Sequence, residues 1–197
     1  MQNFDIQNIN IQEMRVRLAK LLYERSYREG EFTLTSGRKS DFYFDGKQTA
    51  LHPEGAFLIG HLFNHLLKDN PSVTAVGGLT LGADPLVTAT SVISYQLGRP
   101  LPAFIVRKNP KGHGTNQYLE GLSNLQMGKP VAMLEDVVTT GGSLLTACER
   151  VKEAGFEIGM LCTVLDREEG GNEAIKAAGY ELHSLFRRSE LLALAGS

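Results

Sequence analysis

The sequence lacks several features that would mark a large class of proteins. It has two cysteines, too few for a disulfide framework, and a formal net charge of −2, which gives no basic excess for binding nucleic acid. No apolar run approaches the roughly 20 residues that span a bilayer. The residues after Met1 form neither the charged nor the apolar region of a secretory signal. We therefore expect a cytoplasmic protein with both cysteines reduced and buried, and with no nucleic-acid or membrane partner.

The chain also shows no internal repeat and no low-complexity segment. With 42% hydrophobic residues, a chain of 197 residues can bury a full core as one domain. We expect a single domain over residues 1–197, with a small N-terminal part over about 1–50 and an α/β core over about 51–197.

After Pro53 the hydrophobic pattern alternates between helix and strand. This alternation indicates an α/β fold with a doubly wound parallel sheet, which binds ligands at the carboxyl ends of its strands. Gly77 to Gly82 is predicted to be a loop. Helices are predicted over 11–29, 53–68, 83–97 and 144–154, and strands over 31–34, 42–44, 73–76, 101–106, 131–134, 160–165 and, at an edge, 180–186.

The most informative stretch runs from Val131 to Ser143 and reads Val-Ala-Met-Leu-Glu-Asp-Val-Val-Thr-Thr-Gly-Gly-Ser. Its first four residues form an apolar run that is typical of a strand buried on both faces of a parallel sheet. The acid pair Glu135 and Asp136 follows, and a turn of hydroxyls and glycines then leads into a predicted helix. Such a turn binds phosphate through free backbone N–H groups and the helix dipole. The carboxylates repel phosphate, so we expect them to face sugar hydroxyls.

This turn is neither of two common phosphate-binding motifs. It holds no lysine, which a Walker loop requires, and no G-x-G-x-x-G dinucleotide fingerprint. A glycine-rich turn with two solvated acids is the alternative, but consecutive acids next to a core strand disfavour it. The stretch resembles the phosphoribosyl pyrophosphate (PRPP) motif of type I phosphoribosyltransferases. The resemblance implies that the acids hold the ribose 2′ and 3′ hydroxyls and that the turn wraps the 5′-phosphate. The implied PRPP-binding residues are Glu135, Asp136, Val137, Val138, Thr139, Thr140, Gly141, Gly142 and Ser143.

A second motif opens the long stretch between residues 106 and 130, which shows no clear helix or strand and is predicted to be a flexible lid. In a closed, water-excluded site its cations would stabilise a leaving pyrophosphate. A solvated basic loop is the alternative. The motif reads Arg107-Lys-x-x-Lys-x-His-Gly114. Its spacing resembles the catalytic loop of orotate phosphoribosyltransferases, which closes over the site of a neighbouring subunit. The resemblance implies catalytic and PRPP-binding roles for Arg107, Lys108, Lys111 and His113.

Three further features resemble the same family. Residues 32–44 are similar to its N-terminal hood, which implies that Tyr43 and Phe44 lie against the orotate ring. The segment around Arg167 resembles the one whose arginine contacts the orotate carboxylate, and a guanidinium can donate two parallel hydrogen bonds to that group. Thr139 matches a threonine that also contacts orotate. Taken alone, Arg167 is more typical of a surface ion pair with the glutamates that follow it.

The resemblance spans about Leu18 to Phe186 and departs from the family at two positions. Many members have PRPP-contacting lysines where this chain has Thr35 and Gly82. Backbone amides of the loop over 77–84 would take over pyrophosphate contacts. The side chains that replace the two lysines are left open by the sequence.

The resemblance implies transfer of ribose 5-phosphate from PRPP to orotate, which gives orotidine 5′-phosphate and pyrophosphate in pyrimidine (UMP) synthesis. The implied cofactor is Mg²⁺, bound mainly through PRPP, because a hard divalent cation bridges phosphate oxygens. The implied assembly is a homodimer with shared active sites. Two alternatives stay open: a phosphoribosyltransferase for another base, and a non-catalytic regulator that keeps the fold and binds PRPP or a nucleotide as an effector.

Overall fold

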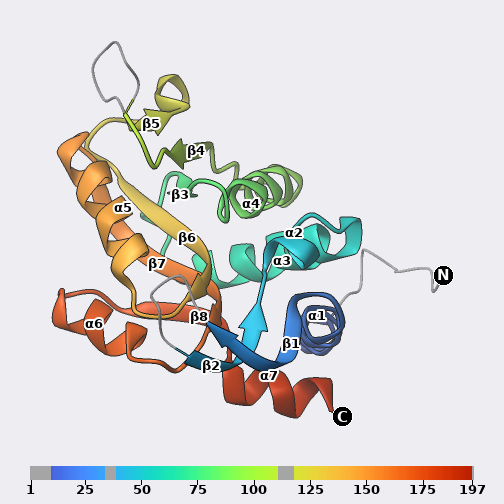
Figure 1. The fold of residues 1–197 in the computed structure, drawn as a ribbon. Helices are drawn as coiled ribbons and strands as arrows, with labels where there is room; N and C mark the ends of the chain where they lie inside the picture. Colours follow the sequence, from blue (N-terminus) through green and yellow to red (C-terminus); the bar gives the residue numbers. More distant parts are fainter. Residues whose placement is uncertain (1–9, 34–38, 111–117, 197) are drawn as a thin grey trace.

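The computed structural model describes residues 10–33, 39–110 and 118–196. Within them, a six-stranded sheet has the order β5-β4-β3-β6-β7-β8, and a separate two-stranded sheet pairs β1 with β2 (Figure 1). All neighbours in the large sheet are parallel except β5, which runs antiparallel to β4. The expected α/β class with a mostly parallel sheet is confirmed. The strands of the large sheet are β3 (Val76–Leu79), β4 (Ala103–Val106), β5 (Leu119–Glu120), β6 (Pro130–Val138), β7 (Glu157–Asp166) and β8 (Leu182–Arg187).

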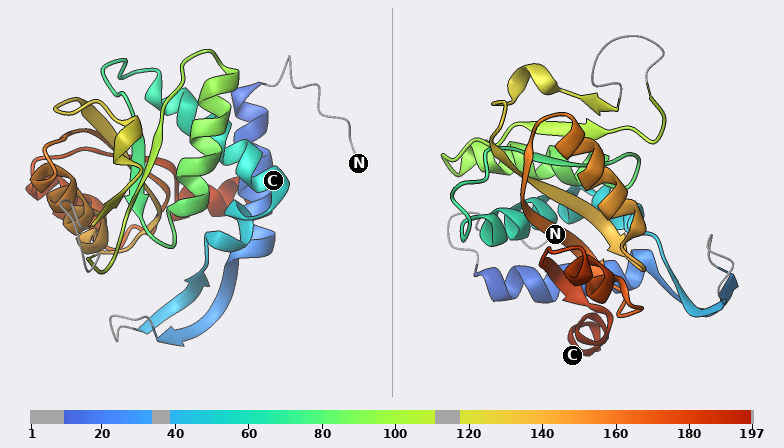
Figure 2. Two further views of the ribbon diagram at one scale, coloured as in Figure 1. Left: turned by 90° about the horizontal axis from the view of Figure 1, so that it is seen from above. Right: turned by 90° about the vertical axis from the view of Figure 1, so that its left-hand side faces the viewer.

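Helices cover both faces of the large sheet (Figure 2). Alternation along β6 explains this, because Ala132 and Leu134 join one buried hydrophobic cluster while Val131 and Met133 join another. The first cluster contains side chains of α1, α3, α4 and α7, and the second contains side chains of α5 and α6. The helices are α1 (Ile11–Ser26), α2 (Lys47–Ala50), α3 (Pro53–Leu67), α4 (Asp84–Gln96), α5 (Gly142–Glu153), α6 (Gly171–Ala177) and α7 (Arg188–Ala195), with a short 3₁₀ helix, η1, over Leu122–Asn124.

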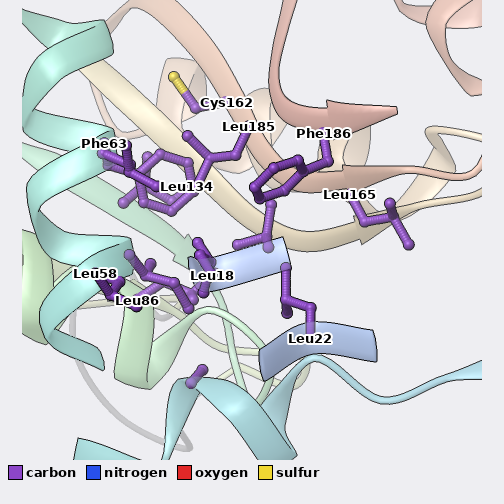
Figure 3. Packing of buried hydrophobic residues seen from close by; sticks show 14 of the residues in the cluster. Leu18, Leu22, Leu58, Phe63, Leu86, Leu134, Cys162, Leu165, Leu185 and Phe186 are labelled. Carbon is purple, nitrogen blue, oxygen red and sulfur yellow. The ribbon is translucent and has the colours of Figure 1, made fainter. Parts of the chain in front are cut away.

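The first cluster anchors the N-terminal helix to the sheet. Leu18 and Leu22 of α1 are fully buried and lie beside Leu134 of β6, Phe63 of α3 and Phe186 of β8 (Figure 3). At the start of α1, the backbone N–H of Gln12 donates to the side chain of Asn10 over 2.9 Å, which caps the helix. The segment before the alternating pattern therefore packs on the same core.

The N-terminal hairpin consists of β1 (Tyr27–Thr33) and β2 (Lys39–Phe44) and projects from the layered body (Figure 2). Its residues match the segment expected to form a hairpin, although two boundaries differ. The predicted helix over 11–29 ends at Ser26, because Tyr27 already pairs with Phe44 in the hairpin. The first strand accordingly starts before residue 31.

The prediction for residues 73–82 is wrong in an informative way. Gly77 and Gly78 lie inside β3, not in a loop, and the strand begins at Val76. A Cβ atom on Gly77 would meet the ring of Phe104 at 2.1 Å, and one on Gly78 would meet the carbonyl oxygen of Leu134 at 2.3 Å. Glycine is present in this central strand because its neighbours leave no room for a side chain. The edge strand β8 is confirmed, whereas α2, α6, α7, η1 and β5 were not predicted.

Cys148 on α5 and Cys162 on β7 are both free and buried, as the sequence indicated. Burial raises the pKa of each thiol to about 12. In the part of the chain that the structure describes, no helix combines the length and apolarity needed to cross a membrane.

Candidate active site

The acid pair lies within the last residues of β6, since this strand continues four residues beyond the predicted end, from Leu134 to Val138. Glu135 and Asp136 are only 7% and 8% exposed. The backbone N–H of Val137 donates to Oδ1 of Asp136 over 2.9 Å, which fixes that carboxylate against its own strand. The acids are therefore held rigidly at the carboxyl edge of the sheet.

The turn after β6 leads directly into α5. Gly141 precedes the helix with φ of +80°, a conformation that glycine adopts without a steric penalty. A small cavity of about 90 Å³ opens here at the N-terminus of the helix. Free backbone N–H groups and the helix dipole at such a position attract a phosphate group. The cavity is lined by Glu135, Val137, Val138, Thr139, Thr140, Gly141, Gly142, Ser143 and Leu144.

A larger cleft of about 450 Å³ shares part of this lining. It joins the acid pair to the loop after β3 and to the end of the hairpin. Of the residues expected in the site, the structure brings seven together in this cleft. The whole lining comes from four separate segments of the chain. The lining is Phe44, Lys47, Leu79, Thr80, Leu81, Gly82, Lys108, Glu135, Asp136, Val137, Thr139 and Ser143.

The two carboxyl groups have a strong electrostatic effect on each other. Burial raises the pKa of Glu135 well above its ordinary value, and the neighbouring charge of Asp136 raises it further. The positive charge of Lys108 acts in the opposite direction and favours the ionised form. Nearby hydrogen-bond donors or cations would therefore stabilise the ionised form of Glu135.

Two glycines make room for Asp136. A Cβ atom on Gly82 would lie 2.8 Å from Oδ1 of Asp136, and one on Gly46 would lie 3.0 Å from its Cβ atom. The loop after β3 and the start of α2 thus close around this carboxylate. At Gly82, the space that a side chain would enter is occupied by Asp136.

The sequence reasoning missed Lys47, which lines the same cleft. It starts α2 directly after the hairpin, and its Nζ atom lies 2.6 Å from Oδ1 of Asp45. The available signal was a cation in Phe44-Asp-Gly-Lys47, immediately after the aromatic run of the hairpin. Nothing in that local pattern connects it with Asp136, which is distant in the sequence.

The two aromatic residues expected next to orotate are placed differently. Phe44 is 6% exposed and lines the cleft. Tyr43 is 44% exposed and does not line it, because alternate residues of β2 point to opposite sides. Its ring centre lies 5.6 Å from that of Phe32, so Tyr43 contacts the other strand of the hairpin.

Arg167 follows β7 and is 4% exposed. Its Nη2 atom donates to Oγ of Ser40 over 2.9 Å and pairs with Oε1 of Glu169 at 2.7 Å. The guanidinium also stacks on the ring of Phe42. The ion pair with a neighbouring glutamate is present, but the side chain is buried against the hairpin and does not lie on an open surface.

The stretch between residues 106 and 130, predicted to be a lid without a helix or strand, contains β5 and η1, so that prediction is wrong for its second half. Arg107 follows β4 and Tyr118 precedes β5, so these two residues flank the remaining connection. The backbone N–H of Arg107 donates to the carbonyl of Tyr118 over 2.7 Å, and its guanidinium pairs with Glu120 at 3.0 Å. Arg150 of α5 donates to the carbonyl of Arg107 over 2.7 Å. Both ends of this connection are thereby held at β4 and β5. Of the two expected cations that the structure describes, Arg107 and Lys108, Lys108 lines the cleft and Arg107 does not. Lys111 and His113 lie outside the described residues.

Comparison with known proteins gives a consistent picture, although no protein-family model matches the chain. An orotate phosphoribosyltransferase from Rhodopseudomonas palustris is 50% identical over 181 residues, which cover 90% of this chain and 96% of that protein. One from a Nostoc species is 46% identical over 182 residues, covering 92% and 87%. A crystal structure of the Mycobacterium tuberculosis orotate phosphoribosyltransferase, in complex with Fe(III) dicitrate, has a TM-score of 0.79 at 42% identity, covering 90% of this chain and 98% of that chain. The same enzyme in complex with PRPP gives 0.74 at 38% identity, with the same coverage.

The mostly parallel sheet, with an acid pair and a phosphate-binding turn at the end of one strand, defines a type I phosphoribosyltransferase. The identities and coverages go further than this class. The chain belongs to the orotate phosphoribosyltransferase family. It is accordingly an enzyme of PRPP-dependent phosphoribosyl transfer to orotate in pyrimidine synthesis.

Proposed function

We propose that this transfer takes place in the 450 Å³ cleft, with PRPP bound along β6 and the N-terminus of α5. The observation that carries the proposal is that Glu135, Asp136 and the turn from Thr139 open into one continuous lining with Phe44 and Lys108. The turn over 139–143 receives the 5′-phosphate, because the small cavity at the helix N-terminus offers backbone donors. The acid pair accepts hydrogen bonds from the ribose 2′ and 3′ hydroxyls.

The chemistry requires stabilisation of charge at both products of bond cleavage. The bond between the anomeric carbon and pyrophosphate breaks, which leaves an oxocarbenium-like ribosyl group and a polyanion. Cations near the leaving group stabilise this transition state more than the ground state. Lys108 already lines the cleft, and Arg107, Lys111 and His113 supply further charge when the lid closes.

Orotate binds on the hairpin side of the cleft. Phe44 provides an apolar surface for the ring, and Thr139 lines the same cleft. The Arg167 guanidinium pairs with the orotate carboxylate, as the family resemblance implies. In the present arrangement Arg167 is not among the residues that line the cleft, and its Nε and Nη2 atoms contact Glu169 and Ser40. Tyr43 reaches the ring only with a change of side-chain position, because it packs on Phe32 in the present arrangement.

Mg²⁺ is the proposed cofactor, and the donor set of the cleft fits it. Glu135 and Asp136 offer the hard oxygen atoms that Mg²⁺ prefers, and with PRPP oxygens they would hold the ion. Across residues 10–33, 39–110 and 118–196, no group of three or more His, Cys, Asp or Glu side chains is arranged to hold a metal ion. As the family resemblance implies, PRPP is proposed to supply most of the ligands. When bound, Mg²⁺ neutralises charge on the pyrophosphate.

The proposed assembly is a cytoplasmic homodimer of single-domain subunits, in which residues about 1–50 form the hood. Each active site is shared, with the lid of one subunit closing over the PRPP turn of the other. This proposal rests on the motif from Arg107 to Gly114 and on the length of the segment that contains it. Its ends are fixed at β4 and β5, so the reach has to come from the residues between them.

The direct test of the reaction is the loss of orotate absorbance on addition of PRPP, measured with and without magnesium chloride. We expect turnover that requires all three components. Uracil, adenine and hypoxanthine serve as competing bases, with pyrophosphate release as the common readout. Turnover of another base in preference to orotate would contradict the proposed base, and PRPP binding without any turnover would support a regulator that has lost activity.

A further inference from the structure

We propose that Lys47 binds the pyrophosphate group of PRPP, as a cation held in the cleft by the folded core and not by the lid. The inference rests on the proposed PRPP site and assigns a residue that the motifs did not indicate. Lys47 lines the 450 Å³ cleft together with Lys108 and the acid pair. It comes from α2, at the junction between the hairpin and the layered body.

Charge balance in the cleft leads to this assignment. The ribose hydroxyls meet Glu135 and Asp136, and the 5′-phosphate meets the turn, so the pyrophosphate lies over the remaining lining. With Phe44 assigned to the orotate ring, that remainder consists of Lys47, residues 79–82 and Lys108. Within the described lining, Lys47 and Lys108 are the two cations, and a polyanion needs both.

The surroundings of Lys47 keep it charged and directed into the cleft. Burial lowers the pKa of Lys47, but the hydrogen bond to Asp45 and the charge of Asp136 outweigh burial, so its pKa is raised overall. The ion pair joins Nζ of Lys47 to Oδ1 of Asp45 at 2.6 Å, and the lysine side chain stays 37% exposed. The same Oδ1 atom also accepts from the backbone N–H of Lys47 over 3.2 Å.

The position of α2 makes Lys47 a permanent part of the wall. Gly46 packs against Asp136, so a Cβ atom there would lie 3.0 Å from the Cβ atom of Asp136. Thr49 of the same helix is fully buried, and its hydroxyl lies 2.7 Å from that of Ser26. Lys47 therefore stands on a short helix that is fixed at both sides, whereas Lys108 stands at the root of the lid.

The competing explanation is that Lys47 is only the ion-pair partner of Asp45. A partly exposed pair of this kind contributes little to stability. Two substitutions separate the explanations, because Lys47→Ala removes both the pair and the cation, and Asp45→Asn removes the pair but keeps the cation. Lys47→Arg preserves the charge and serves as the conservative variant.

The experiment measures the affinity of the purified enzyme for inorganic pyrophosphate and for ribose 5-phosphate by calorimetry in magnesium-containing buffer. We expect Lys47→Ala to weaken pyrophosphate binding by about tenfold to a hundredfold, the effect of losing one charge-assisted hydrogen bond. Ribose 5-phosphate binding should stay within about twofold of wild type, since its contacts are elsewhere. The KM for PRPP should rise while the KM for orotate does not.

Three controls make the outcome decisive. Lys47→Arg and Asp45→Asn should keep most of the pyrophosphate affinity, and Lys129→Ala, on the exposed surface before β6, should match wild type. Unchanged pyrophosphate binding in Lys47→Ala would overturn the inference about Lys47 and would leave the proposed PRPP site intact. Equal losses for pyrophosphate and orotate would also overturn it. If wild type bound neither pyrophosphate nor ribose 5-phosphate, the proposed PRPP site itself would fail, which is a different result.

Discussion

The guanidinium carbon of Arg167 lies 3.9 Å from the centre of the Phe42 ring, so a residue that follows β7 is seated on a side chain of the N-terminal hairpin. Ser40 of the same hairpin strand accepts a hydrogen bond from that guanidinium. Phe42 is fully buried, and Arg188 also stacks on it, at 4.0 Å from the ring centre. The residue proposed to bind the orotate carboxylate is therefore positioned by the hairpin.

Arg167→Ala is expected to weaken orotate binding far more than PRPP binding. Loss of one partner from a desolvated charge pair costs roughly 2–5 kcal/mol. Arg188→Ala is the matched control, because it removes the other guanidinium from the same ring and also its ion pair with Asp41. Steady-state kinetics with each substrate varied would check this. Equal damage to both substrates in Arg167→Ala, or the same orotate loss in Arg188→Ala, would mean that Arg167 is structural.

Glu135→Gln is expected to change the pH dependence of stability. Because the folded pKa of Glu135 is raised, the native state binds more protons than the unfolded state between the two pKa values. Wild type therefore loses stability as pH rises through that window, and the variant does not. Urea unfolding from pH 4 to pH 8 should show that the free energy of unfolding of the variant rises relative to that of wild type as the pH increases. Glu153→Gln, exposed on α5, is the control, and parallel curves for Glu135→Gln would contradict the prediction.

Gly77→Ala is expected to destabilise the protein by about 1–3 kcal/mol or more, the usual cost of overpacking a core. The added methyl group would meet three atoms of the Phe104 ring at 2.1 to 2.4 Å. Gly196→Ala is the matched control, because its backbone has φ of −81° and the nearest atom to the new methyl group lies at 3.4 Å. Urea unfolding compares the two. Equal stability of both variants would contradict the prediction, because it would mean that β3 can accommodate a methyl group at position 77.

Lys111→Ala is expected to reduce kcat by about a hundredfold while the protein stays folded. Loss of one preorganised charge in a closed site typically costs ~3 kcal/mol of transition-state stabilisation. The prediction comes from the spacing of the lid motif alone, as Lys111 lies outside the described residues. Lys176→Ala, exposed on α6, controls for general charge loss. A kcat near wild type in the purified variant would remove Lys111 from the mechanism.

Shared active sites are tested by refolding Lys111→Ala together with Asp136→Ala, each nearly inactive alone. Random pairing makes about half of the dimers mixed, and a lid that acts on the partner then leaves one intact site in each mixed dimer. Activity should return to about a quarter of wild type. The control mixture, Glu135→Ala with Asp136→Ala, should stay inactive, because both residues lie on β6 of the same subunit and every site keeps one lesion. An inactive Lys111→Ala mixture that contains mixed dimers would mean that the lid serves its own subunit.

The parallel core was predictable because its strands are short apolar runs between glycine-bounded helices. β6 was recognised from Val131 to Leu134, but its continuation to Val138 was hidden by Glu135 and Asp136, since adjacent acids look like the end of a strand. They remain in the strand because they face a cleft. Gly77 and Gly78 were predicted to form a loop because a glycine pair is locally typical of a turn. The ring of Phe104 on the neighbouring strand, which leaves no room for a side chain at Gly77, explains why glycine is present in β3.

The site was predictable where the chemistry lies in one continuous segment. The turn over 139–143 needs only its own backbone and the helix that follows, so its pattern is visible in the sequence. Lys47 becomes interpretable only when α2 is placed beside Asp136, a contact between distant segments. The same holds for the position of Arg167 on Phe42, because no local pattern near either residue indicates the other.

The burial of Cys148 and Cys162 makes the protein convenient for labelling. Burial raises the pKa of each thiol to about 12, so both are protonated at neutral pH, and the thiolate is the form that reacts with maleimides or peroxide. Activity should therefore not depend on added reductant. A cysteine introduced at Asn109, which is exposed at the start of the lid segment, would accept a fluorophore without background from the native thiols. A change in fluorescence on addition of PRPP would then test the proposed closure of the lid.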